Sequence, residues 1–144
     1  AKKLNMSIII KSHPFIGEFD LEKLVKDIDP NIPVIRTSSI TPLIQSCEVL
    51  VTFDISTIIL EAQILKKPVI SLQTSPIYLE NELVKMNALL YITKISDIES
   101  TIKKILIDSE LKQQLLEKSK YFLNQHFTNQ GNASEKLANL LDKL

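Results

Sequence analysis

Short apolar runs alternate with amphipathic stretches over most of this chain, and that alternation limits the folds open to it. The runs are rich in β-branched residues, too short for helices and apolar at successive positions, which is typical of strands covered on both faces. Between the runs, apolar residues recur every three or four positions, as on one face of a helix. We therefore expect strands at 6–11, 34–36, 48–53, 68–72 and 89–92, and helices at 21–28, 41–47, 54–66 and 77–87.

The C-terminal part of the chain has a helical pattern only, with expected helices at 96–107, 109–123 and 132–144. Candidate N-caps precede several of the helices: Asp20, Ser96, Ser109 and Asn132. Strands that alternate with helices form βαβ units, so the expected fold class is α/β, a Rossmann-like parallel sheet flanked by helices. Right-handed crossovers place the carboxyl ends of all strands at one edge, where ligands bind in such sheets.

Charge and cysteine content exclude several classes of function. The 144 residues carry 17 Lys+Arg and 17 Asp+Glu, and this net charge of zero argues against a nucleic-acid-binding surface. Cys47 is the only cysteine, which excludes an internal disulfide, and no His or carboxylate cluster has the spacing of metal ligands. No apolar run approaches the roughly 20 residues that span a bilayer. These features predict a single domain over 1–144, no metal and a cytoplasmic location.

Glycine is scarce, which limits how the chain could hold a phosphate. Only Gly17 and Gly131 occur in the sequence. A Walker A loop or a G-x-G-x-x-G turn needs two or three glycines close together, so neither can form. A phosphate would instead bind to side-chain hydroxyls and to the free backbone N–H groups at a helix N-terminus.

Ser56 and Thr57 lie where the helix after the third expected strand begins. Their hydroxyls and the first N–H groups of that helix form a candidate anion site. Glu61 follows Thr57 by four residues, so it lies on the same helix face about 6 Å further along. A diphosphate at the helix start would leave an attached ribose near Glu61, whose carboxylate can accept both sugar hydroxyls. The alternative is that Ser56 is only a helix cap and Glu61 only a surface carboxylate.

His13 is the second candidate for a functional residue. Pro14 disfavours helical backbone for His13 and so extends the chain at the end of the first strand. The imidazole would then point across the sheet edge, where it can hydrogen-bond a phosphate or act on a sugar hydroxyl. A structural loop histidine is the alternative. His126, beside a polar stretch, is expected to be structural, and Cys47 is expected to be a buried apolar residue.

Four segments together resemble the C-terminal, nucleotide-binding half of glycosyltransferases with two Rossmann-like domains, the GT-B fold. Residues 11–14 (KSHP) are similar to the family's K-x-H-P, and 47–57 to its "aDvvvT-D-x-S-[ST]". Residues 61–70 resemble "EA…gKPvI", and 131–138 resemble the closing "G-x-aSekia" helix. The most similar groups are surface-polysaccharide transferases, CDP-glycerol glycerophosphotransferases and non-hydrolysing UDP-N-acetylglucosamine 2-epimerases.

The resemblance implies a donor-binding role for five residues and a catalytic one for His13. Ser56 and Thr57 would hold the diphosphate of a nucleotide-activated donor, and Glu61 would hold its ribose. Asp54 belongs to the same motif, and Ser38, within 37–40, would border the base. His13 would lie near the phosphates or the transferred group. No separate cofactor is implied, because the nucleotide sugar or CDP-polyol donor is itself the substrate.

The family also has a strand and a helix before the K-x-H-P strand, and an acceptor-binding domain before those. The resemblance thus implies that this chain is the donor half of a two-domain enzyme of surface-polysaccharide synthesis, inactive on its own. Lys67 stands near the family's glycine, which removes a flexible helix C-cap.

Two alternatives stay open. One is a 2-epimerase of the same fold, although Ser56 and Thr57 stand where epimerases have Ser-Gly-Gly. The other is a non-catalytic module that binds a partner protein, since no complete catalytic set is present. Peripheral association of the whole enzyme with a membrane, and self-association of the chain, also stay open.

Overall fold

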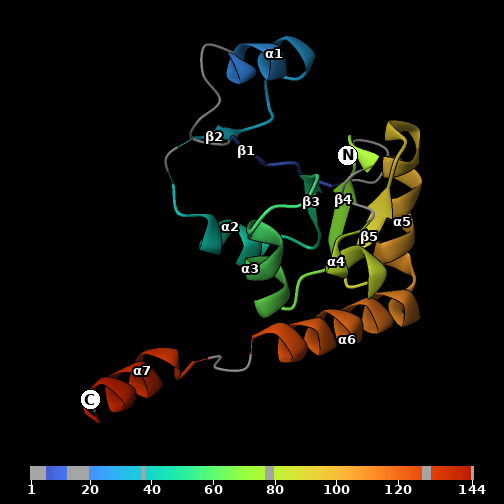
Figure 1. Ribbon diagram of the computed structural model, residues 1–144. Helices are drawn as coiled ribbons and strands as arrows, with labels where there is room; N and C mark the ends of the chain where they lie inside the picture. The colour runs from blue at the N-terminus through green and yellow to red at the C-terminus, as the bar shows by residue number, and fades with distance from the viewer. Residues whose placement is uncertain (1–5, 13–19, 37, 77–79, 128–130, 144) are drawn as a thin grey trace. The chain divides into compact units, whose positions relative to one another are not determined.

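β4 (Val69–Leu72) is the central strand of a parallel three-stranded sheet, and all of its residues are buried. β3 (Leu50–Phe53) pairs with one side of β4 and β5 (Leu90–Ile92) with the other. Figure 1 shows this sheet in the computed structural model, which describes residues 6–12, 20–36, 38–76, 80–127 and 131–143. The strands lie in sequence order, so each strand pairs with the one that precedes it in the chain.

The chain divides into two units, 1–46 and 47–144, which we describe separately. The elements of the first unit are β1 (Ile10–Lys11), α1 (Leu21–Ile28), β2 (Val34–Ile35) and α2 (Ile40–Ser46). β1 and β2 are parallel, with Ile10 opposite Val34. The predicted cap of α1 is confirmed, because the Lys23 backbone N–H donates to the Asp20 carboxylate at 3.0 Å.

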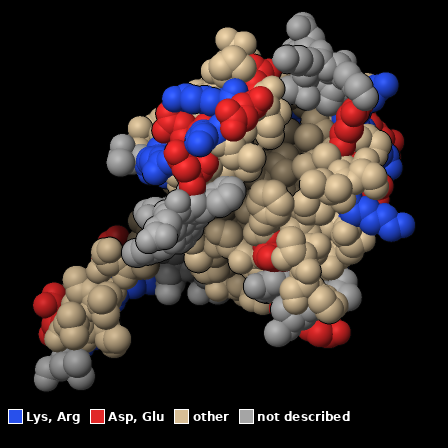
Figure 2. Space-filling view, turned by 90° about the horizontal axis from the view of Figure 1, so that it is seen from above, with Lys and Arg blue, Asp and Glu red and all other residues tan. Residues whose placement is uncertain are grey.

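Charges of both signs lie next to each other on the face that Figure 2 shows. In the first unit, Lys26 pairs with Glu22 at 2.7 Å, and Arg36 lies 3.4 Å from Asp20 and 4.0 Å from Glu22. All of these side chains are well exposed, so each pair contributes at most about 1 kcal/mol to folding.

The second unit adds helices to the sheet of β3, β4 and β5. These are α3 (Ile58–Ile64), α4 (Glu82–Lys85), the 3-10 helix η3 (Ile95–Asp97), α5 (Ile98–Ile107), α6 (Ser109–His126) and α7 (Ala133–Leu141). None of the helices in the described part of the chain is long and apolar enough to cross a membrane. The architecture is α/β and Rossmann-like, with parallel strands that alternate with helices and with helices at the C-terminal end. The fold class predicted from the sequence is therefore confirmed.

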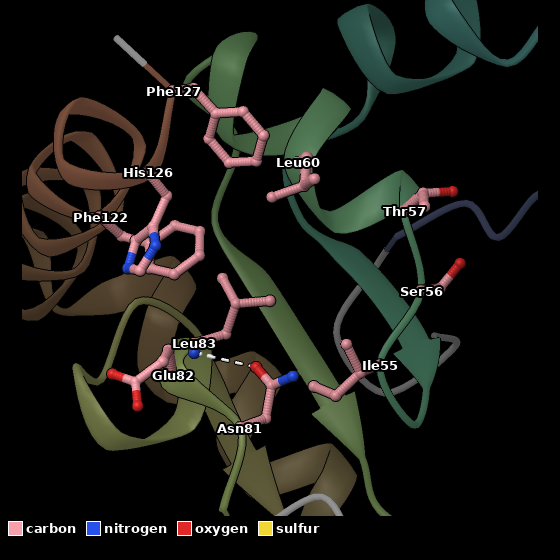
Figure 3. Close-up of a pocket in the computed structure, with 10 residues that line it drawn as sticks. All are labelled: Ile55, Ser56, Thr57, Leu60, Asn81, Glu82, Leu83, Phe122, His126 and Phe127. Atoms are coloured by element: carbon pink, nitrogen blue, oxygen red, sulfur yellow. Dashed lines mark hydrogen bonds between the residues drawn. The ribbon is translucent and has the colours of Figure 1, made fainter.

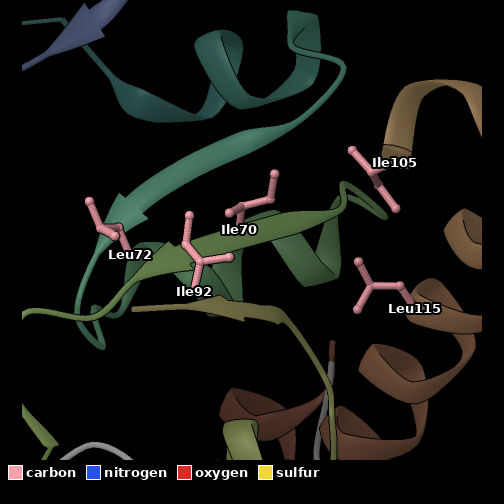
Figure 4. Close-up of a cluster of buried hydrophobic side chains, with 5 residues drawn as sticks. All are labelled: Ile70, Leu72, Ile92, Ile105 and Leu115. Atoms are coloured by element: carbon pink, nitrogen blue, oxygen red, sulfur yellow. The ribbon is translucent and has the colours of Figure 1, made fainter. Parts of the chain in front are cut away.

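The core of the second unit lies where α5 and α6 cover the sheet (Figure 4). Alternate residues of a strand point to opposite faces, so Ile70 and Leu72 share one face of β4. They pack with Ile92 of β5, Ile105 of α5 and Leu115 of α6, all of which are buried. Burying one such side chain stabilises the fold by about 1.5–3 kcal/mol. This core fixes the carboxyl edge of the sheet, from which the loops before α3 and α4 emerge.

α3 is shorter than the helix predicted at 54–66 because the backbone turns left-handed at both ends. Asp54 has a φ of 51° and Lys66 a φ of 56°, and neither value is compatible with a right-handed helix. At the C-terminal end, the Lys67 N–H donates to Ala62 O at 2.8 Å and the Lys66 N–H to Gln63 O at 3.0 Å. These two bonds form a Schellman motif. The left-handed position that favours glycine is therefore Lys66 and not Lys67, which corrects the sequence interpretation.

Two predicted caps are wrong by one residue. Asp97 rather than Ser96 precedes α5, and Asp108 rather than Ser109 caps α6, where its carboxylate accepts the Leu111 N–H at 2.9 Å. In both cases an aspartate next to the predicted serine occupies the cap position. Asn132 does precede α7, without a side-chain cap bond. The helix predicted at 77–87 is reduced to α4 in the part of the chain that is described, and 77–79 lie outside that part.

Candidate functional site

Asp54 lies directly after β3 and is fixed by residues of the neighbouring strand. Its N–H donates to Leu72 O at 3.0 Å, and its carbonyl accepts the Ser71 hydroxyl at 2.7 Å. Its carboxylate accepts both the Thr74 N–H at 2.8 Å and the Thr74 hydroxyl at 2.7 Å. The hydrogen bonds from Thr74 hold the pKa of the Asp54 carboxyl below its usual value. Asp54 therefore connects the β3–α3 loop to the end of β4, and its carboxylate oxygens are already engaged.

A buried polar chain extends from this point. The Gln73 side-chain amide donates to the Ser71 hydroxyl at 2.8 Å, and Gln73 is only 5 % exposed. The side-chain oxygen of Gln73, Oε1, is buried and has no hydrogen-bond partner among the residues that the structure describes. An orphaned buried oxygen is uncommon in folded proteins. The carboxyl end of β4 is thus polar in its interior as well as at its surface.

Ser56 and Thr57 lie at the start of α3, as the sequence predicts. Thr57 occupies the N-cap position, but its side chain makes no capping bond. The backbone carbonyls of both residues accept N–H groups of the first helical turn at 3.0 Å, from Ile59 and Leu60. Neither hydroxyl bonds to any residue that the structure describes, so the simple capping interpretation of Ser56 is not supported. α3 has only seven residues, so its dipole is small and the hydroxyls would carry most of the binding of an anion.

Glu61 lies in the first turn of α3, four residues after Thr57. It is half-buried, and its carboxylate makes no hydrogen bond or ion pair to the described residues. A carboxylate paired within the fold would have such a partner, and Glu61 has none among the described residues. The side chain of Glu61 is therefore available to accept hydrogen bonds from a ligand.

Two predicted site residues belong to the first unit. Ser38 is exposed between β2 and α2. His13 lies outside the described residues, so its predicted position opposite Ser56 stays a prediction. In the described part of the same unit, Lys11 Nζ donates to Ser12 O at 3.0 Å and to Arg36 O at 2.7 Å. This lysine ties the carboxyl ends of β1 and β2 together.

An open pocket of about 370 Å³ lies beside the start of α3 within the second unit (Figure 3). It is formed by the β3–α3 loop, α3, the start of α4 and the end of α6, and is lined by Ile55, Ser56, Thr57, Leu60, Asn81, Glu82, Leu83, Phe122, His126 and Phe127. The Ser56 and Thr57 hydroxyls point away from His126, whereas Leu60 points toward the pocket (Figure 3). The pocket wall and the hydroxyls thus lie on different sides of the start of α3.

Sequence reasoning missed the aromatic end of α6. His126 stacks on Phe122 with ring centroids 4.5 Å apart, and Phe127 meets Phe122 edge-on at 6.4 Å. The sequence does place three aromatic rings, those of Phe122, His126 and Phe127, within six residues, and this clustering could have indicated an aromatic surface. Only the tertiary fold shows that they reach α3. His126 therefore has a structural contact, as predicted, and also lines the pocket.

The described residues offer no other chemical centre. They contain no group of three or more His, Cys, Asp or Glu that could hold a metal ion. Cys47 is half-buried, and burial raises the pKa of its thiol. Comparison with known proteins finds no matching family model, no matching curated protein and no matching solved structure. The assignment of a function therefore rests on the residues at the carboxyl edge of the sheet.

Proposed function

We propose that this chain is the part of a transferase that binds a nucleotide-activated donor, a nucleotide sugar or a CDP-polyol. One observation carries the proposal. Thr57 and Glu61 lie one turn apart at the start of α3, after the carboxyl end of β3, and neither side chain has a partner among the described residues. The carboxyl edge of a parallel sheet is where ligands bind in α/β folds. The motif resemblance points to the same residues.

The site would act by hydrogen bonding. The Ser56 and Thr57 hydroxyls would donate to diphosphate oxygens, bonds that are stronger than those between neutral groups. The Glu61 carboxylate would accept the two ribose hydroxyls. Asp54 is not assigned a ligand contact, since both oxygens of its carboxylate accept hydrogen bonds from Thr74. We therefore assign Asp54 to the support of the loop. Ser38 remains the proposed contact to the base.

His13 is the proposed catalytic residue. A neutral imidazole could accept the proton of an acceptor hydroxyl as that hydroxyl attacks the donor, and a charged imidazole could hydrogen-bond a phosphate. The acceptor-binding groups would come from a further domain of a longer enzyme, of surface-polysaccharide synthesis by the motif resemblance. Transfer of the activated group would then need both parts.

The test is a titration of the chain with UDP and with CDP, followed by NMR at the Ser56 and Thr57 amides. The proposal expects shifts at these amides and at Glu61, with saturation at millimolar ligand. The same titration with ribose 5-phosphate separates recognition of the nucleoside diphosphate from general anion binding. Absence of shifts with both nucleotides, or shifts confined to α5 and α7, would rule the proposal out.

A protein-interaction module is the second candidate, and α7 is the observation that favours it. All described residues of α7 are exposed, including Leu137, Leu140 and Leu141 at 56–59 %. An amphipathic helix gains stability by burying such a face. If the chain binds neither nucleotide but self-associates in analytical ultracentrifugation, and Leu137→Glu abolishes the association, the second candidate replaces the first.

A further inference from the structure

The loop between β3 and α3 is held from one side by residues 71–74. We propose that Thr74 is a positioning residue, which fixes the backbone of residues 54–57 through the Asp54 carboxylate and thereby places the Ser56 and Thr57 side chains. The importance of Thr74 for ligand binding rests on the proposed function, whereas its effect on the conformation of the loop is independent of that function.

Both oxygens of one carboxylate bind to one residue, which is the first support for this inference. Asp54 Oδ1 accepts the Thr74 N–H at 2.8 Å, and Oδ2 accepts the Thr74 hydroxyl at 2.7 Å. A pair of hydrogen bonds at short distance fixes the orientation of a carboxylate as well as its position. The Asp54 side chain is therefore held by two contacts that only a serine or threonine at position 74 can supply together.

The Asp54 backbone is fixed at the same time. Its N–H donates to Leu72 O at 3.0 Å, and its carbonyl accepts the Ser71 hydroxyl, which in turn accepts the Gln73 side-chain amide. Asp54 is thus held at its N–H, its C=O and its carboxylate by residues from a single strand end. The direction in which the chain leaves Asp54 toward Ser56 is set by these contacts.

The left-handed backbone makes this support necessary. Asp54 has a φ of 51°, in the left-handed region that residues other than glycine seldom adopt and that Asp and Asn tolerate best among them. Such a conformation persists when the surrounding bonds determine it. Without the Thr74 hydroxyl, residues 54–57 would sample other conformations, and the two hydroxyls at the start of α3 would no longer be held in one place.

Matched variants distinguish the effect of the Thr74 hydroxyl from the effect of the side-chain shape. Thr74→Val removes the hydroxyl and keeps the shape, whereas Thr74→Ser keeps the hydroxyl. Thr93→Val is the control, because Thr93 is an exposed threonine directly after β5, and its side chain makes no bond to the described residues. All variants are made in the full chain.

We expect Thr74→Val to accelerate amide hydrogen exchange at Ile55, Ser56 and Thr57, and to weaken binding of UDP or CDP by roughly 2- to 12-fold. Thr74→Ser should restore both, and Thr93→Val should behave like the unmodified chain. If Thr74→Val lowers the melting temperature but leaves loop exchange and nucleotide affinity unchanged, Thr74 is only a stabilising residue and the inference is wrong.

The unmodified chain supplies a second test that does not depend on the folding of a variant. The amide proton of Thr74 and the carboxyl carbon of Asp54 should shift together on acidification, with one common midpoint. Separate midpoints would overturn the inference. If the unmodified chain binds neither nucleotide, the proposed function fails, while the exchange and titration results still decide whether Thr74 positions the loop.

Discussion

Gln63 and Ser119 donate hydrogen bonds to the same carbonyl oxygen, that of Ala88, at 2.8 and 2.7 Å. Both side chains are buried, and they come from α3 and α6, while Ala88 lies just before β5. The Gln63 Oε1 oxygen is buried and has no hydrogen-bond partner in the described part of the chain. This shared acceptor connects the helix that carries the candidate site to the longest helix of the second unit.

The shared acceptor predicts that two substitutions will not be additive. Ser119→Ala should lower the free energy of unfolding by about 1 kcal/mol, since one buried hydrogen bond is lost. Gln63→Met should cost less, because it also removes the orphaned oxygen. The double variant leaves the Ala88 carbonyl without either donor and should lose about 1–3 kcal/mol more than the sum. Urea denaturation of the four proteins measures this difference, and additive losses would contradict the shared-acceptor interpretation.

Replacing the left-handed Lys66 with glycine should stabilise the chain. Lys66 ends α3 with a φ of 56°, and its exposed side chain makes no bond to the described residues. Lys66→Gly relieves the left-handed strain and should raise the free energy of unfolding by about 0.5–1 kcal/mol. Asn87, with a φ of 51° at the equivalent position after α4, is the matched control. Because asparagine tolerates this region, Asn87→Gly should have a smaller effect. Equal melting temperatures for Lys66→Gly and the unmodified chain would disprove the prediction.

Acidification should weaken the fold through Asp54. Hydrogen bonds from Thr74 lower the pKa of Asp54 in the folded chain, so the ionised carboxylate favours folding. This stabilisation is present at neutral pH and is lost as the pH falls below about 4 and through the folded pKa. Asp54→Asn, which tolerates the same left-handed backbone, should flatten that part of the stability profile. Unfolding free energies of both proteins at a series of pH values measure this difference. Parallel pH profiles would show that Asp54 contributes nothing to the pH dependence of stability.

Glu61→Gln should reduce nucleotide affinity without changing stability. Glu61 has no partner among the described residues, so the unfolding free energy should stay within about 0.5 kcal/mol. If the carboxylate binds ribose hydroxyls, UDP or CDP affinity should fall by about 1–2 kcal/mol, or roughly 5- to 30-fold. Titration calorimetry on the unmodified chain and on Glu61→Gln measures the two nucleotide affinities. The 2′-deoxy nucleotide should show a smaller loss, because one hydroxyl contact is already absent, and equal losses for both ligands would exclude ribose binding.

Thr57→Val tests the proposed diphosphate contact separately from the ribose contact. The side chain keeps its shape and makes no cap bond in the free chain, so stability should change little. Loss of one hydroxyl donor should weaken nucleoside diphosphate binding by about 0.5–1.5 kcal/mol. The nucleoside without phosphates should bind equally well to both proteins. A parallel loss for the nucleoside would place Thr57 elsewhere in the site.

Local patterns predicted the order of the elements well, because each strand and helix is marked by its own residues. The strand expected at 68–72 is β4 at Val69–Leu72, and the helix expected at 21–28 is α1 with the same bounds. The ends were less predictable. The apolar pattern continues through Asp54 and Lys66, which predicts helix at both positions. The left-handed turn at Asp54 is held by bonds to residues at the end of β4, and the one at Lys66 by a Schellman motif that closes α3 on itself.

The candidate site was predicted in part. The position of Ser56 and Thr57 at a helix start follows from the local sequence. The bond between Asp54 and Thr74 joins residues 20 positions apart and has no local signal. Likewise, the aromatic end of α6 lines a pocket with Leu60 only because the two helices pack together. Contacts of this kind are set by tertiary structure, which periodicity and motifs do not encode.

The order of the strands in the second unit has a consequence for how the chain acquires its structure during synthesis. β3, β4 and β5 lie side by side in the order in which a ribosome delivers them. Each strand can therefore pair with the one made just before it, and each pairing joins segments fewer than about 20 residues apart in the sequence. Because Ile105 of α5 and Leu115 of α6 complete the core over this sheet, we expect the paired strands, and with them the loop that carries Ser56 and Thr57, to become stable only after α6 has been translated.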